Sequence, residues 1–168
     1  MWYIIQTDIV DKNIQKIEKL LGNTAKAVFS PTRAIEKKFK GNWELEMKSL
    51  FPGYIFVDSD EAAETIEDAL EVLIDTNAIK PVYIGGAFAP IKEAEQSTLS
   101  SLLDSRYVVQ KSFGDIIDGN LVVTKGPLKG KENLVSKIDR HKRIATITLP
   151  LMEESQRMMV ALEIINKN

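Results

Sequence analysis

A glycine-rich turn between two strand-like runs constrains the fold of this chain more than any other feature. The runs Leu121–Val123 and Leu134–Ile138 carry the aliphatic and β-branched residues typical of short strands. Between them, Pro127 has a fixed φ, while Gly126 and Gly130 permit backbone conformations closed to other residues. The pattern predicts a small β-barrel, and the lysines in its turn indicate contact with nucleic acid. An ordinary hairpin is the alternative interpretation of this segment alone.

From Asp115 onward the sequence predicts only short strands. Five of them in so short a stretch are typical of an SH3-like β-barrel. The expected strands are Ile116–Ile117, Leu121–Thr124, Leu134–Ile138, Ile144–Leu149 and Met158–Ile165.

The N-terminal part alternates strands with amphipathic helices. Apolar residues at helical spacing predict one helix over Asp11–Leu21 and another over about Glu61–Leu73. This order predicts an antiparallel sheet with helices on one face, and therefore an α+β fold. The expected strands are Met1–Thr7, Ala27–Phe29, Leu50–Val57 and Ile79–Ile84, with a charged hairpin over Ala34–Met47 that turns at Gly41 and Asn42.

The two patterns predict two domains. We expect an N-terminal domain over residues 1–95, a linker over 96–112 and a C-terminal domain over 113–168. A short helix is expected over Pro90–Leu103, followed by the connecting segment Asp104–Phe113. Proteolysis in this region should release two separately folded pieces.

The net charge of −2 hides two segments of opposite sign. Lys125–Arg143 holds seven basic and two acidic residues, a net charge of +5. Asp58–Asp75 holds eight acidic residues and no basic one, a net charge of −8. Because basic groups attract phosphates and acidic groups repel them, any RNA contact is expected in the C-terminal half. The acidic run is interpreted as a solvated face.

Composition argues against catalysis and against a membrane span. The chain has no cysteine and one histidine, so thiolate metal sites and multi-histidine centres are excluded, and we expect no cofactor. No P-loop or dinucleotide fingerprint occurs. Alternate carboxylates such as Glu44 and Glu46 are interpreted as surface charges. No apolar run approaches the ~18 residues of a membrane span, and no signal peptide is seen. With the absence of cysteine, this predicts a cytoplasmic protein, and we expect it to be a monomer.

Three motifs together resemble one family. The chain opens with Met1-Trp2-Tyr3-Ile4-Ile5, and Phe51-Pro52-Gly53-Tyr54-Ile55-Phe56-Val57 follows. Both resemble motifs of the N-terminal (NGN) domain of NusG-type transcription factors, and the Gly126–Asp139 segment resembles the KOW motif that follows it in that family. The turn and the basic run Asp139–Arg143 look like the LoaP antiterminators. One departure is Asn133, where a glycine is usual, although asparagine also accepts a left-handed conformation.

The resemblance implies a binding site for the clamp helices of RNA polymerase. Along the central strand, Tyr54 and Phe56 share one face, while Ile55 and Val57 share the other. By resemblance, Tyr54 lines the polymerase-binding cavity, with Phe56 and Trp2 as further candidates. The alternative is that these aromatic side chains pack in the domain core.

The resemblance also implies an RNA site on two basic loops of the barrel, which we expect at a common rim. Arginine offers a planar fork to phosphate or guanine, and a histidine can stack on an unpaired base. The alternative is a solvated hairpin tip. The candidate RNA-binding residues are Lys129, Lys131, Arg140, His141, Lys142 and Arg143.

These observations predict an antiterminator that binds RNA polymerase and a nascent RNA, preferably a hairpin. Two alternatives remain open. The first is a general elongation factor whose KOW domain contacts the ribosome or a termination factor. The second is a ribosome-associated structural protein, which the N-terminal motifs disfavour.

Overall fold

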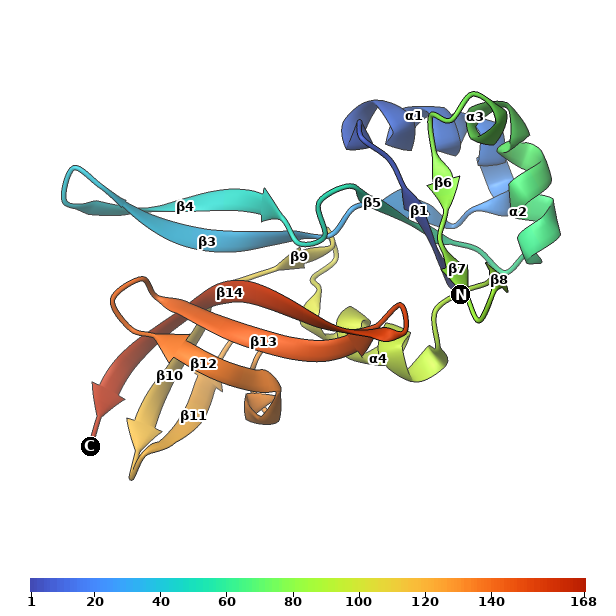
Figure 1. The fold of residues 1–168 in the computed structure, drawn as a ribbon. Coiled ribbons are helices and arrows are strands. Elements are labelled where there is room, and N and C mark those ends of the chain that lie inside the picture. The colour runs from blue at the N-terminus through green and yellow to red at the C-terminus, as the bar shows by residue number, and fades with distance from the viewer. The chain divides into compact units, whose positions relative to one another are not determined.

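The computed structural model describes residues 1–168 and shows an α+β protein, as predicted. The chain forms two compact units (Figure 1). Unit 1 comprises residues 1–31 and 51–97, and unit 2 comprises residues 32–50 and 98–168. The hairpin over residues 32–50 therefore belongs to the unit that holds the C-terminal strands. The bounds 1–95, 96–112 and 113–168 remain a prediction about which parts fold alone.

Unit 1 is built on a four-stranded sheet with the order β2-β5-β1-β6. Its strands are β1 (Trp2–Gln6), β2 (Ala27–Phe29), β5 (Tyr54–Asp58) and β6 (Lys80–Pro81). All pairs are antiparallel. The central pair aligns Ile4 with Phe56 and Ile5 with Ile55, so alternate residues of β1 and β5 face opposite sides of the sheet.

One face of this sheet carries helices α1 (Val10–Leu21), α2 (Ala63–Ala69) and α3 (Glu71–Asp75) (Figure 1). The first helix is confirmed, whereas the second predicted helix is two short ones that meet at Leu70. Apolar side chains from both layers form one core. Its members include Tyr3, Ile5, Ile17, Leu21, Ile55, Val57, Ile66, Leu70 and Leu73.

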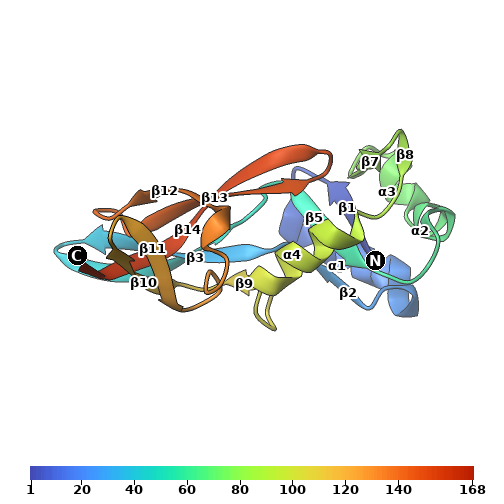
Figure 2. The same ribbon diagram turned by 90° about the horizontal axis from the view of Figure 1, so that it is seen from below.

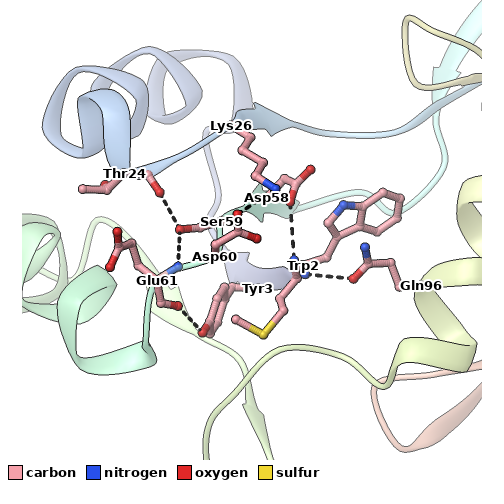
Figure 3. Close-up of polar contacts among 10 residues, drawn as sticks. Trp2, Tyr3, Thr24, Lys26, Asp58, Ser59, Asp60, Glu61 and Gln96 are labelled. Carbon is pink, nitrogen blue, oxygen red and sulfur yellow. Dashed lines mark hydrogen bonds and ion pairs between the residues drawn. The ribbon is translucent and has the colours of Figure 1, made fainter.

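A polar corner ties the end of β5 to the start of α2 (Figure 3). The buried Ser59 hydroxyl accepts from the Glu61 N–H at 3.1 Å and donates to the carbonyl of Thr24. The Tyr3 hydroxyl donates to the Glu61 carbonyl at 2.7 Å, and burial together with nearby Glu64 raises the pKa of Tyr3.

Two acidic residues of the same corner are held in ion pairs (Figure 3). Asp58 lies 3.5 Å from the N-terminal amine, and Asp60 lies 2.8 Å from Lys26. Lys26 and Asp60 are both exposed, so their pair adds little to stability.

The predicted strand Ile79–Ile84 is divided between two sheets. Its first part is β6, while β7 (Tyr83–Ile84) pairs with β8 (Ala87–Phe88) in a small hairpin. A 3₁₀ turn, η1 (Gly22–Thr24), follows α1.

In unit 2, strands β3 (Thr32–Phe39) and β4 (Asn42–Ser49) form the long predicted hairpin. Strand β9 (Val108–Val109) pairs in parallel with β3 at Thr32 and Arg33. The segment expected as a linker, residues 96–112, thus contains most of helix α4 (Glu93–Leu102) and the whole of β9.

The remaining strands of unit 2 form a five-stranded sheet with the order β11-β10-β14-β13-β12. Strand β10 pairs in parallel with β14, and the other pairs are antiparallel. In Figure 2, β3 runs beside β14, and Arg33 donates to the carbonyl of Met159 across them. The closed SH3-like barrel stays a prediction. The strands are β10 (Ser112–Ile117), β11 (Asn120–Lys125), β12 (Val135–Asp139), β13 (Ile144–Leu151) and β14 (Glu154–Lys167).

None of the helices combines the length and the apolar composition that a membrane-spanning helix needs.

Candidate functional site

Tyr54 begins β5 at a tightly held turn. Its N–H donates to the Phe51 carbonyl at 3.1 Å, and its own carbonyl accepts from the Ser30 hydroxyl at 2.8 Å. Gly53 has a φ of +84° and accepts from the Thr7 N–H at 2.8 Å. Tyr54 is half-buried.

Phe56 and Trp2 lie deeper on the same face of the sheet. Phe56 is 0% exposed and Trp2 is 5% exposed. Their ring centroids are 5.9 Å apart, and Phe29 lies 5.5 Å from Phe56. Such aromatic pairs stabilise a core. Both side chains therefore support the surface on which Tyr54 lies, and Tyr54 has the largest exposed share of the three candidates.

The glycine-proline turn folds back onto the start of β10. Leu128 is fully buried, and its N–H donates to the hydroxyl of buried Ser112 at 3.1 Å. Gly126 has a φ of +104°, and a Cβ there would lie 2.6 Å from the Ser112 Cα. Only glycine fits this approach, which explains why the turn carries it.

The first basic loop follows this turn. Glu132 closes it by accepting from the N–H groups of Val123 at 3.1 Å and Gly130 at 3.3 Å. Hydrogen bonds from backbone N–H groups hold the pKa of Glu132 below its ordinary value. Lys129 is exposed and Lys131 is half-buried. The loop is thus closed by Glu132, and of its two lysines Lys129 is the more exposed.

The second basic loop connects β12 to β13. Asp139 caps it by accepting from the Lys142 N–H at 3.0 Å. Arg140, His141 and Lys142 are exposed.

The expectation that the two basic loops lie at a common rim is wrong. The first loop precedes β12 and the second follows it, so they lie at opposite ends of one strand. At ~3.3 Å per residue, this strand separates them by roughly 17 Å. Arg140 and His141 accordingly form a surface separate from that of Lys129 and Lys131.

Arg143 differs from its neighbours because it is held in an ionic cluster. Its Nη1 lies 2.9 Å from Glu36 Oε2 and 3.0 Å from Glu163 Oε1. Lys111 pairs with the same two carboxylates, at 2.7 Å from Glu163 Oε1. The Glu36 side chain is only 6% exposed, so this charge needs its two cationic partners.

The cluster also fixes the position of an aromatic ring. The guanidinium carbon of Arg143 lies 4.2 Å from the ring centroid of Trp43, which is on β4. The Lys111 hydrogen bond, together with the charges of Lys111 and Arg143, holds the pKa of Glu163 below its ordinary value. Arg143 is thus a positioned, half-buried group.

A cavity of about 750 Å³ opens beside this stack. Three of the six candidate RNA-binding residues, Arg140, His141 and Arg143, line it. The sequence interpretation did not include Trp43 and Lys38, which also line it. The only sequence signal for them is an aromatic residue near lysines in the hairpin. Glu36 gave no signal, because it lies 107 residues from Arg143.

Comparison with protein families gives a match over the N-terminal part of the chain. The family model for NusG, described as transcription termination factor nusG, matches residues 1–100. Comparison with curated proteins gives no match. The matched residues include all of unit 1 and the hairpin β3–β4.

Proposed function

The chain belongs to the NusG family, and from this premise we propose that it is a specialised NusG paralogue, of the LoaP type, that promotes processive elongation and antitermination. Factors of this family bind RNA polymerase. We assign that contact to an NGN-type domain in the N-terminal part and to the clamp helices of the polymerase. The family match over residues 1–100 is the observation that carries the proposal.

Tyr54 is the proposed centre of the polymerase contact. Its ring is partly exposed at the edge of an aromatic face whose other members, including Phe56 and Trp2, are buried. A tyrosine supported by a rigid core buries a large ring on binding while its hydroxyl still finds a polar partner. The bound factor would favour the processive state of the enzyme by binding it more tightly than the paused state.

The C-terminal strands are proposed to form a KOW domain that binds nascent RNA, with a hairpin as the preferred target. The basic segment from Lys125 to Arg143 supports this assignment, since its net charge of +5 attracts phosphates. The protein would act in the cytoplasm as a monomer, without a cofactor and without catalysing a reaction itself. The second candidate is a general elongation factor whose KOW domain contacts the ribosome or a termination factor.

Transcription in vitro across an intrinsic terminator, behind the leader RNA of the chain's own operon, tests the proposal. We expect the chain to increase readthrough, and the effect to depend on the leader. A variant in which Lys129, Lys131, Arg140 and Lys142 are replaced by Gln should lose the leader dependence, because it loses phosphate contacts.

The leader dependence of readthrough separates the two candidate functions, and the sign of the effect tests antitermination itself. Readthrough that is independent of the leader and unchanged in the quadruple variant would favour the general elongation factor. Increased termination would contradict antitermination.

A further inference from the structure

The cavity beside Trp43 has the features of a site for one flat, negatively charged ligand. Its volume of about 750 Å³ lies within the ~300–1,000 Å³ range of small-ligand sites. Its wall includes the apolar side chains of Ile138 and Ile164 and the paired planar groups of Trp43 and Arg143, with Lys38 Nζ 6.0 Å from the Trp43 ring centroid. Arginine planes and aromatic rings are the surfaces on which proteins stack unpaired RNA bases.

The charges of the cavity favour an anion. Its lining includes the basic residues Lys38, Lys137, Arg140 and Arg143 and two carboxylates. Both carboxylates are already engaged. Glu163 pairs with Lys111 and Arg143, and Asp139 accepts from a backbone N–H. The four basic residues outnumber the two carboxylates, so the lining carries an excess of positive charge that attracts a phosphate.

The wall of the cavity is held in place before any ligand arrives. Glu36 and Glu163 orient the Arg143 guanidinium at 2.9 and 3.0 Å, and the guanidinium lies over Trp43 at 4.2 Å. Arg143 also has a φ of +54°, an uncommon conformation for a residue with a side chain. A preorganised wall lowers the entropic cost of ordering side chains on binding.

We propose that this cavity, formed jointly by the hairpin β3–β4 and the turn between β12 and β13, holds one unpaired nucleotide of the RNA. The base lies against the Trp43–Arg143 stack, and its phosphate lies at Lys137 and Arg140. The proposal rests on the RNA-binding function proposed above, and it adds a recognition element from outside the KOW segment.

The test compares two RNA probes by fluorescence polarisation. One is a pool of hairpins with a randomised unpaired loop, and the other is their stem closed as a blunt duplex. Trp43→Ala should weaken binding of the loop pool roughly 5- to 150-fold, the range measured for base–aromatic stacking. Duplex affinity and the salt slope of loop binding should stay unchanged, because stacking releases no ions.

Two further variants separate stacking from a general disturbance. Trp43→Phe keeps a ring in the wall and should retain most of the loop affinity. Phe39→Ala is the matched control, because Phe39 is a 58% exposed aromatic residue of the same hairpin. It should bind both probes as the parent does.

Tryptophan emission gives an independent readout. The chain has two tryptophans, and Trp2 is only 5% exposed. The loop pool should therefore quench the emission of the parent through Trp43 and leave that of Trp43→Phe unchanged.

Equal loop affinity of Trp43→Ala and the parent would overturn the nucleotide site while leaving RNA binding by the basic loops intact. Equal loss of duplex and loop binding would also overturn it. Displacement of the loop pool by a poly-glutamate peptide as effectively as by single-stranded RNA would assign the cavity to an acidic protein segment instead. Absence of binding to either probe would overturn the RNA function together with this site.

Discussion

Replacing Gly126 by alanine tests the physical reason for the glycine-proline turn. The new Cβ would lie 2.6 Å from the Ser112 Cα and 2.7 Å from the Lys111 carbonyl oxygen. Both are backbone atoms, so no side-chain rotation relieves the clash. The turn or β10 must therefore shift, and the contact of buried Leu128 with Ser112 shifts with it.

Gly130 provides a matched control in the same turn. Its φ is +78°, but a Cβ there meets nothing within 4 Å. Left-handed backbone strain of ~1–2 kcal/mol thus applies to both alanine variants. Overpacking adds ~1–3 kcal/mol at Gly126 alone. We expect the free energy of unfolding to fall by about 2–5 kcal/mol in Gly126→Ala and by about 1–2 kcal/mol in Gly130→Ala.

Thermal unfolding followed by circular dichroism measures the difference. For a chain of this length, 1 kcal/mol corresponds to ~2–4 °C, so Gly126→Ala should melt roughly 2–12 °C below Gly130→Ala. Equal melting temperatures would refute the steric argument, because strain in φ alone would then account for both variants.

Two further predictions concern the ionic cluster of unit 2. Glu36→Gln should lower the free energy of unfolding in urea by roughly 2–3 kcal/mol, because Lys111 and Arg143 lose a buried counter-charge and keep only Glu163. Glu46→Gln removes one partner of an exposed pair with Lys37 and should lower it by about 0.5 kcal/mol or less. Equal losses in the two variants would contradict the role of burial. Because the pKa of Glu163 is lowered in the folded state, its stabilising contribution is present above the ordinary glutamate pKa of ~4.3 and is lost as the pH falls below it. Melting temperatures measured between pH 7 and pH 3 should therefore fall less steeply for Glu163→Gln than for the parent, and parallel curves would contradict this.

Local pattern predicted the elements of unit 1 well. Alternation along β5 places Ile55 and Val57 in the core with the helices, and Phe56 among the aromatic residues of the other face. Helix α1 follows its apolar spacing. The break between α2 and α3 at Leu70 was not predictable, since no glycine or proline marks it.

In unit 2, contacts between residues far apart in the sequence could not be predicted. The sequence identifies Arg143 as one of several basic residues, and nothing near it indicates that Glu36 holds its side chain. Lys111 was expected in a linker and instead belongs to the same cluster. The prediction that the two basic loops share a rim was wrong because of the strand topology: β12 runs between them.

Binding to purified RNA polymerase tests the central claim most directly. The chain should bind the core enzyme, and Tyr54→Ala should weaken this binding by roughly 30-fold or more, as expected for a hot-spot residue worth ~2 kcal/mol. Tyr83→Ala is the matched control, because Tyr83 is a 61% exposed tyrosine of the same unit. Polymerase affinity that is equal in the parent, Tyr54→Ala and Tyr83→Ala would remove Tyr54 from the interface, and failure of the parent to bind would contradict the account as a whole.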